Sequence, residues 1–361
     1  MPGKTIEIVG GGLAGLTLAI GLRQRGVPVR VLEMGGYPRH RVCGEFISGR
    51  GIDALRRLDL FPTVLGAGAL EGQTAKFVLS RHSAFTRPLP EPALMISRFH
   101  LDQCLADKLL ELSGELIQHA PRASVGRCAS EGVVRATGRR LNRGDPKPTW
   151  FGLKVHASGV TFAEDLEMHA HPKGYVGLCR LPKGEVNICG LFRGSEPAPP
   201  GVNATSGRQP SWRDILTGPT GSPLHQLLET ARFDLASFCS VAGLSLRPFA
   251  NTTPEECSLG DALTMTPPVT GNGMSMAFES AELALEPLTE YSHGTLSWDS
   301  ARQTIAGRCH QAFDKRLRWA RLLQSVMTNP LLQRGIGGWI LNSPRLWNLM
   351  FDRTRSAGLQ A

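Results

Sequence analysis

The sequence predicts an α/β fold with three parts: a glycine-loop (Rossmann-like) nucleotide domain, a mixed β-sheet substrate domain and a helical C-terminus. Three observations predict it: a strand, a glycine-rich loop and a helix open the chain, paired strand segments fill its middle, and apolar residues at helical spacing end it. The 361 residues, of which 41% are hydrophobic and 20% charged, are enough to bury two interleaved domains.

The first elements form a nucleotide-binding pattern. Residues 5–9 are a β-branched strand, the next helix ends at Gly26, and residues 27–32 form a second strand that ends in Glu33. Strand, GxGxxG, helix, strand and an acid about 20 residues on make up the dinucleotide fingerprint. We expect Glu33 to accept from ribose hydroxyls. The residues expected to hold a diphosphate at the helix start are Gly10, Gly12, Leu13, Ala14 and Gly15. The alternative is a glycine turn that only packs helix on strand.

A second glycine loop lies near the other end of the chain. Gly260-Asp261 is an acidic turn, and Gly271-Asn272-Gly273-Met274 opens a helix that continues through residue 288. Amide groups at a helix start stabilise negative charge. A nicotinamide site needs only the first motif, so the pair of loops indicates a flavin. The alternative is a Pro-Gly loop before an ordinary core helix.

Both loops resemble those of the flavoprotein superfamily of p-hydroxybenzoate hydroxylase, and more closely its geranylgeranyl reductase-like branch. The resemblance covers most of the chain. Its other anchors are Arg41-Val42-Cys43-Gly44-Glu45, Arg98 and Ala136-Thr137-Gly138. It implies FAD as the cofactor, with Asp261 beside the ribityl chain and diphosphate. It also implies that the backbone of Gly271, Asn272 and Gly273 meets the pyrimidine edge of the ring and that Arg98 contacts the cofactor; the alternative for Arg98 is a solvated cation.

The loop after the second strand supplies the reactive candidates. Arg41 is expected to reach the diphosphate. The resemblance places Cys43 close to the flavin. Reactivity of Cys43 would need a lowered thiol pKa, which Arg41 is placed to cause; the alternative is a small buried thiol that only packs. Glu45 is interpreted as a solvated loop acid rather than a proton donor.

The resemblance also implies an electron donor. NAD(P)H is the expected transient donor, because hydroxylases of the superfamily use it. They carry an acid where this chain has Thr137, however, and this difference argues against direct reduction by a nicotinamide.

The predicted domains are discontinuous. Residues 1–70, 98–148 and 240–290 form the FAD-binding domain, residues 71–97 and 149–239 the β-sheet substrate domain, and residues 291–361 the C-terminal helical region. Within the substrate sheet, residues 150–160, 174–179 and 185–192 are expected strands, the last two joined at Lys183-Gly184. The tryptophan and Phe-Pro of the reductases' lipid-pocket motif are missing beside Tyr175, and so is the paired-tryptophan signature of flavin-dependent halogenases.

The function predicted from these features is that of a FAD-dependent monooxygenase, which hydroxylates or epoxidises a small apolar organic substrate of secondary or lipid metabolism. One alternative is a C=C reductase of geranylgeranyl reductase type, with Cys43 or a neighbour as proton donor. Another is a non-catalytic flavin-binding module that docks a partner.

Positive charge is concentrated near the C-terminus. The net charge is +9, and residues 308–355 carry nine Lys or Arg against two acids. Trp319, Leu322, Leu323, Val326 and Met327 predict one apolar helix face there. The basic helices either form a solvated rim or contact a membrane or a carrier that delivers the substrate. No nucleic-acid motif accompanies the charge.

The eight cysteines show neither a disulfide framework nor a zinc pattern, and His156, His169 and His171 lack companions for a metal site. The early first strand leaves no room for a signal peptide, which predicts the cytoplasm.

Overall fold

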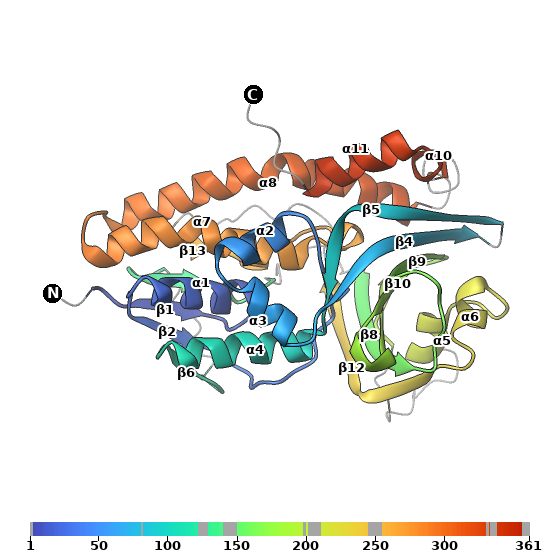
Figure 1. Cartoon of the computed structure of the whole chain (residues 1–361), viewed down its shortest axis with the longest axis horizontal. Helices are drawn as coiled ribbons and strands as arrows, with labels where there is room; N and C mark the ends of the chain where they lie inside the picture. The colour runs from blue at the N-terminus through green and yellow to red at the C-terminus, as the bar shows by residue number, and fades with distance from the viewer. Residues whose placement is uncertain are drawn as a thin grey trace.

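A computed structural model gives the arrangement of the chain. It describes residues 3–355 except 81, 122–128, 140–149, 198–199, 201–210, 245–254, 330–331 and 333–337. Sheet A lies toward the N-terminal end of the molecule and sheet B toward the other end, and long helices run along both (Figure 1).

Sheet A is a five-stranded parallel sheet in the order β13-β7-β1-β2-β6. Its strands are β1 (Ile6–Val9), β2 (Val29–Leu32), β6 (Glu115–Ile117), β7 (Val133–Arg135) and β13 (Cys257–Ser258). Ile6, Ile8 and Val31 are fully buried, as expected for parallel strands that are covered on both faces. The predicted strand–loop–helix–strand unit is confirmed.

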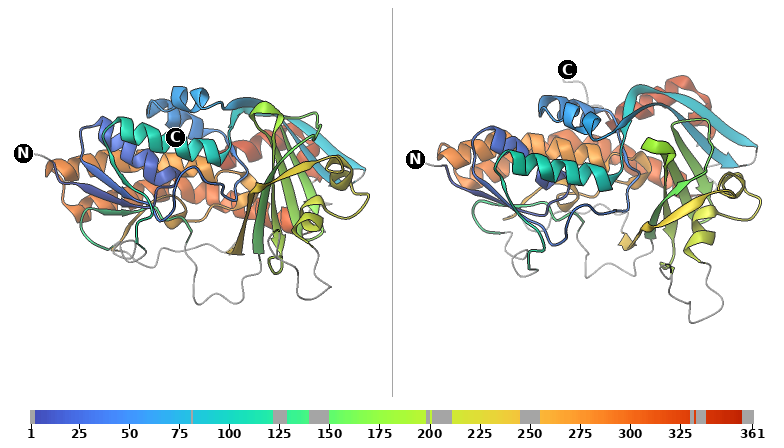
Figure 2. Two further views of the ribbon diagram at one scale, coloured as in Figure 1. Left: turned by 90° about the horizontal axis from the view of Figure 1, so that it is seen from below. Right: turned by 60° about the horizontal axis from the view of Figure 1, so that its bottom comes forward.

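Helices surround sheet A and continue toward sheet B (Figure 2). They are α1 (Leu13–Gln24), α2 (Arg50–Arg57), α3 (Phe61–Gly66), α4 (Arg98–Glu111), α7 (Gly273–His293) and α8 (Trp298–Thr328). Helix α1 packs against both α4 and α7. Gly21 permits the contact with α7, because a Cβ there would lie 2.7 Å from a methyl group of Leu285.

Sheet B is an eight-stranded mixed sheet in the order β12-β8-β11-β10-β9-β4-β5-β3, with β4 and β9 parallel. Its strands are β3 (Phe46–Ile47), β4 (Leu70–Ser80), β5 (Ser83–Met95), β8 (Trp150–Ser158), β9 (Leu166–His171), β10 (Gly174–Arg180), β11 (Val186–Arg193) and β12 (Arg232–Leu244). The turn η2 (Pro182–Gly184) joins β10 to β11, with Lys183 at φ 61°. The predicted hairpin is confirmed, and with it the mixed sheet.

The two faces of sheet B differ. Phe151, Leu153 and Val155 of β8 pack in an apolar cluster with α5 (Trp212–Thr217) and α6 (Pro223–Leu227). The alternate residues, Lys154 and His156, point the other way, because successive side chains in a strand leave opposite faces. We call the face that carries Lys154 and His156 the inner face, since the loop after β2 packs on it.

The C-terminal region is helical, as predicted. Helix α8 lies beside α7, and the short α10 (Gly338–Asn342) and α11 (Pro344–Arg355) cover the β4–β5 hairpin (Figure 1). Trp347 of α11 donates from Nε1 to the Pro88 carbonyl, at 3.1 Å. Among the described residues no helix is long and apolar enough to cross a membrane.

The predicted apolar face of α8 is partly wrong. Leu322 is 54% exposed, whereas Arg316 and Gln324 are buried. The buried positions of this part of the helix are Phe313, Arg316, Leu317, Ala320, Gln324, Val326 and Met327. The reason is Glu279 on α7: its carboxylate receives three hydrogen bonds of 3.0 Å from the Arg316 guanidinium, so the helix turns a cation inward.

Candidate functional site

The carboxyl edge of sheet A brings four predicted segments together. Gly10 follows β1, Glu33 follows β2, Ala136 follows β7, and Gly260 lies just beyond β13 at the start of η3 (Gly260–Ala262). Parallel neighbouring strands end at the same edge, which is where open α/β sheets bind their ligands. Segments up to about 250 residues apart in sequence therefore face one region.

Only one of the three fingerprint glycines faces open space. A Cβ on Gly10 (φ +109°) would lie 2.4 Å from the Ala136 carbonyl oxygen, and one on Gly15 would lie 2.0 Å from that of Gly10. Gly10 and Gly15 are thus required for packing inside the protein. A Cβ on Gly12 would meet nothing within 4 Å, and no side chain caps α1, which starts there. The free amides of this helix start fit a diphosphate.

Glu33 is already engaged by the protein. It accepts from the amides of Gly11 and Gly35, both at 2.8 Å, and from Arg39 Nη1 at 2.6 Å. Burial opposes ionisation, but these hydrogen bonds outweigh it and lower the Glu33 pKa to about 2. Glu33 therefore holds the glycine loop in shape as an ionised carboxylate, and its contact with a ribose stays a prediction.

The second glycine loop forms a matching helix start. After η4 (Pro268–Thr270), Gly271 adopts φ +64° against the Phe46 ring, where a Cβ would lie 2.1 Å away. Helix α7 begins at Gly273, where a Cβ would again meet nothing, and no side chain caps it. Asn272 and Met274 are buried. Two uncapped helix starts, one beside each glycine loop, fit the two ends of FAD: the diphosphate at α1 and the electron-rich ring edge at α7.

Arg98 connects the predicted residues. Its guanidinium donates from Nε and Nη2 to the two carboxylate oxygens of Asp102, at 2.6 and 2.8 Å. Arg41 Nε lies 3.7 Å from the same carboxylate. The charge of Arg98 acts on the thiol of Cys43 and on the carboxylate of Asp261. The Arg98 side chain is only 12% exposed and is held in an ion pair, so the alternative of a solvated cation is wrong.

Asp261 keeps solvent-exposed surface, yet protein surrounds it closely enough that burial raises its pKa to about 6; Arg98 opposes this shift. A carboxylate that is destabilised in this way gains from hydrogen-bond donors such as ribityl hydroxyls.

We expect FAD affinity to fall as the pH drops through about 6, because protonated Asp261 can no longer accept two hydroxyl hydrogen bonds. Asp261→Asn should flatten this dependence. The folding stability of the FAD-free protein should depend on pH in the opposite direction. A raised folded pKa makes wild-type stability fall as the pH rises from about 4 through 6, and the variant should lack this fall. FAD titration and thermal unfolding between pH 4.5 and 8 test both trends. A wild-type affinity that is flat across pH 6 would contradict the assignment.

The structure corrects the expectation for Cys43. Burial raises the pKa of its thiol, and the nearby charge of Arg98 offsets this only in part. The expected lowering by Arg41 is wrong, because Arg41 is drawn toward Asp102. Cys43 lies against the inner face of sheet B, where Asn187 Nδ2 donates to its carbonyl at 2.9 Å. Its thiol therefore stays protonated at neutral pH. A protonated thiol is a poor nucleophile but has a proton to donate.

The interpretation of Glu45 as a solvated acid is also wrong. Glu45 is 0% exposed, at φ +61°, and forms a buried ionic cluster with the inner face. Its Oε1 accepts from the Arg98 amide at 3.0 Å and lies 3.4 Å from Lys154 Nζ, while Oε2 lies 2.7 Å from His156 Nε2. Lys154 Nζ is also 3.0 Å from His40 Nδ1. Burial opposes ionisation of Glu45, but His156 and Lys154 outweigh it and lower the Glu45 pKa.

Sequence reasoning missed Lys154 and His40 and treated His156 only as a metal candidate. One signal was present: Lys154 and His156 interrupt the apolar strand β8 at alternate positions, which places two polar side chains on one face. Only the fold shows that an acid of the distant loop faces them. Among the described residues no cluster of three or more metal-binding side chains occurs.

An apolar patch continues the inner face beyond the ionic cluster. Tyr175, Leu191 and Leu244 are buried there, and Trp150 and Val269 pack against them. Val269 belongs to η4, so this patch reaches the loop at which α7 starts.

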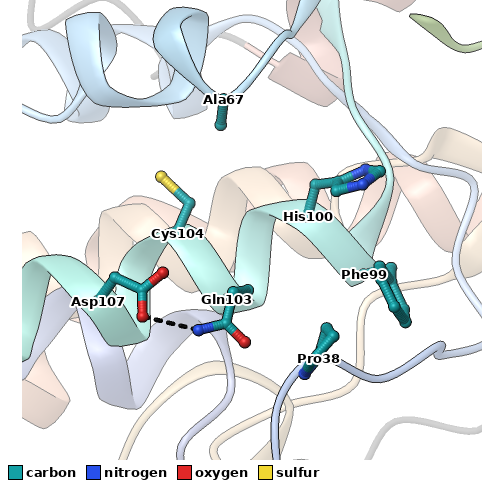
Figure 3. A pocket seen from close by; sticks show the side chains of 7 residues that line it. All are labelled: Pro38, Ala67, Phe99, His100, Gln103, Cys104 and Asp107. Atoms are coloured by element: carbon teal, nitrogen blue, oxygen red, sulfur yellow. Dashed lines mark hydrogen bonds between the residues drawn. The ribbon is translucent and has the colours of Figure 1, made fainter. Parts of the chain in front are cut away.

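A separate hollow lies beside α4 (Figure 3). It measures about 370 Å³ and is lined by Pro38, Ala67, Phe99, His100, Gln103, Cys104 and Asp107. In the close-up, Gln103 Nε2 donates to Asp107 Oδ1 at 2.7 Å. None of the predicted site residues lines this hollow.

Comparison with known proteins supports the fold. A family model for NAD(P)-binding Rossmann-like domains matches residues 8–50, from β1 through α1 to the start of α2. No curated protein matches the chain. The predicted Rossmann-like unit is therefore confirmed.

Solved structures share the whole architecture. The flavin-dependent brominase Bmp2 has 16% identity and a TM-score of 0.72, over 97% of this chain and 93% of Bmp2. A flavoprotein/dehydrogenase from Cytophaga hutchinsonii has 14% identity and a TM-score of 0.68, over 97% and 99%. A mutant of halogenase PltM in complex with FAD has 14% identity and a TM-score of 0.70, over 99% and 84%.

At these identities the likeness establishes the fold, which this chain shares with flavin-dependent halogenases. None of the three is named a geranylgeranyl reductase, so that branch stays a prediction from the motifs.

Proposed function

We propose that this protein is a FAD-dependent oxidoreductase and that its reaction is the monooxygenation of a small apolar substrate. The pair of uncapped helix starts, at Gly12 and Gly273, is the observation that carries the proposal. A nicotinamide dinucleotide would need only the first. The PltM complex with FAD, which has the same fold, supports the choice of cofactor.

Each residue has a physical task in this proposal. The α1 amides beyond Gly12 bind the diphosphate, and Asp261 orients the ribityl hydroxyls. The amides at the start of α7 stabilise negative charge on the reduced ring. Bound FAD would supply electron transfer and oxygen activation. The apolar patch around Tyr175 and Leu191 binds the substrate and excludes water on the inner face.

The test is a cofactor and oxygen experiment. Purified protein should show a flavin absorption spectrum; protein that neither carries nor binds FAD would remove every flavin-based function. Bleaching of the flavin on anaerobic mixing with NADH or NADPH, followed by recovery of the absorbance and release of peroxide when oxygen is admitted, would support the monooxygenase with NAD(P)H as donor. Because Thr137 replaces the acid linked to NAD(P)H use, absence of bleaching would assign reduction to a partner reductase. Bound FAD that reacts with neither donor nor oxygen would favour the non-catalytic docking module.

Halogenation is a second candidate, supported by the shared fold of Bmp2 and PltM. The missing paired-tryptophan signature argues against it. An assay of a phenol with reduced flavin, oxygen and bromide separates the two reactions: a bromine isotope pattern in the product indicates halogenation, and a mass increase of one oxygen atom indicates monooxygenation.

C=C reduction is the third candidate, because the protonated thiol of Cys43 fits a proton donor. We expect Cys43→Ala to retain most oxygen-dependent turnover, since a monooxygenase does not need that proton. A C=C reductase should instead lose activity by about 100-fold or more. Product formation with and without oxygen, in wild type and variant, decides between them. Cys257→Ala is a matched control, because Cys257 is a buried thiol of sheet A.

The basic C-terminal helices support a further proposal, peripheral contact with a membrane that supplies the substrate. Leu322 of α8 and Trp339 of α10 are 54% and 67% exposed. Arg318 of α8 and the two arginines Arg345 and Arg353 of α11 are exposed as well. Exposed apolar and cationic side chains together favour an anionic lipid surface. Failure to co-sediment with anionic vesicles at low salt would exclude this contact and leave the solvated rim and the carrier as alternatives. A location in the cytoplasm stays a prediction.

A further inference from the structure

The loop that precedes α7 is held by hydrogen bonds from the C-terminal helices α8 and α11. Three hydrogen bonds link them: from the Val269 amide to Gln324 Oε1 at 3.0 Å, from Arg355 Nη2 to the Thr270 carbonyl at 2.8 Å, and from Asn272 Nδ2 to the Thr354 carbonyl. The bonds fall on three of the four positions that precede Gly273. This short loop, whose regular structure is the single turn η4, is thus fixed by side chains and a carbonyl from α8 and α11.

Arg355 is the central member of this set. Besides Thr270, its guanidinium donates from Nε to Ser48 Oγ at 2.9 Å, and it lies over the Phe351 ring at 4.3 Å. It therefore bridges the loop to the turn before α2. No ion pair is present between Arg355 and a carboxylate among the described residues, and burial lowers its pKa to about 10. A cation withdrawn from water is costly unless its donors are used, and here the Thr270 carbonyl and the Ser48 hydroxyl accept from them.

The helices that supply these contacts are themselves anchored. Arg316 of α8 pairs with Glu279 of α7 at 3.0 Å, and Arg50 reaches the same carboxylate at 3.2 Å. Arg316 Nη1 also donates to the Arg355 carbonyl, at 3.2 Å. The end of α11 is therefore tied to the helix whose start it positions.

We propose that Arg355 and Gln324 are positioning residues that fix residues 267–273, so that the amides of the α7 start meet the flavin ring. The C-terminal helical region is in this way part of the cofactor site. The inference rests on the proposed function, which places the ring at this loop. Beyond that function, we infer that flavin binding at the start of α7 depends on Arg355 and Gln324, which do not touch the cofactor.

The test separates the two ends of the cofactor in the full-length chain. FAD contacts both glycine loops, whereas 5′-ADP fits only the Gly12 end. Arg355→Gln should weaken FAD binding about tenfold or more, the loss expected for charge-assisted hydrogen bonds, and leave ADP affinity within about twofold. The midpoint potential of the bound flavin should also become more negative, because loosened amides stabilise the reduced ring less. Arg353→Gln is the matched control, since it removes an exposed arginine of the same helix.

Gln324→Met is the second variant, because it removes the Val269 contact from a different helix. It should likewise weaken FAD binding and leave ADP affinity nearly unchanged. A variant that had merely lost its fold would lose affinity for both ligands. Equal losses for FAD and ADP, an unchanged FAD affinity, or a split in only one variant would overturn the proposal. Wild-type protein that binds ADP but not FAD would contradict the proposed function itself. In that case the variants would show no difference in flavin binding or potential.

Discussion

Replacing Gly12 with aspartate should abolish FAD binding without harming the fold. Gly12 has ordinary extended geometry, φ −86° and ψ −171°, and a Cβ there meets no protein atom within 4 Å. Gly12 is the N-cap residue of α1, a position that aspartate suits, so the cofactor-free protein should keep or slightly raise its Tm. Its carboxylate would occupy the space and repel the diphosphate. We expect FAD affinity to fall about 100-fold or more, roughly 3 kcal/mol.

The measurements are FAD titration of the cofactor-free protein and its thermal unfolding. Gly10→Ala is the contrasting control. Gly10 has φ +109°, and a Cβ would lie 2.4 Å from the Ala136 carbonyl oxygen, so this variant should lose stability, by about 1–3 kcal/mol or more. If Gly12→Asp retained wild-type FAD affinity, the diphosphate would not lie at the start of α1.

Replacing Glu45 with glutamine should give the largest loss of stability among these variants. Glu45 and Lys154 are both 0% exposed, and the substitution leaves the lysine without its carboxylate. Removing one partner of a buried ion pair costs about 3–5 kcal/mol. Urea unfolding at pH 7 measures the loss. Adding Lys154→Met should recover a large part of it, because two neutral side chains remove the unpaired charge.

The matched control is Glu185→Gln. Glu185 lies 3.8 Å from His156 Nδ1 at the rim of the same cluster, and its side chain is 49% exposed. Removing this exposed charge should change stability by less than about 0.5 kcal/mol. Equal effects at Glu45 and Glu185 would show that the buried cluster contributes little to stability.

The Glu45 cluster also predicts a pH dependence. The Glu45 pKa is lowered in the folded state, so its contribution is present above the unfolded pKa of about 4.3 and is lost as the pH falls through the folded value. Wild type should therefore lose more stability than Glu45→Gln below about pH 4.

The sequence predicted the parts of the site that depend on local pattern. The glycine loops at Gly12 and Gly273, the helix starts beside them and the strand before the first loop are each encoded within about 30 residues. The mixed sheet and its hairpin at Lys183 also follow from period-two alternation and turn residues.

The errors concern residues whose environment comes from far along the chain. Glu45 was interpreted as solvated and Cys43 as acidified because both lie in a polar loop rich in arginine. The environment that decides their ionisation comes from more than 50 residues away. His156 and Lys154 outweigh burial at Glu45, whereas at Cys43 burial against sheet B outweighs the charge of Arg98. The predicted face of α8 is partly wrong for the same reason, since Arg316 points inward because Glu279 faces it.

By itself, the sequence therefore determined the fold class and the two loops that indicate FAD, because backbone geometry at glycines and helix starts is a local property. The tertiary structure alone decided which fingerprint glycine faces open space, which acids and thiols keep their protons, and how Arg355 of α11 reaches the loop that precedes α7. Burial and long-range contact set those features, and neither is encoded in the spacing of neighbouring residues.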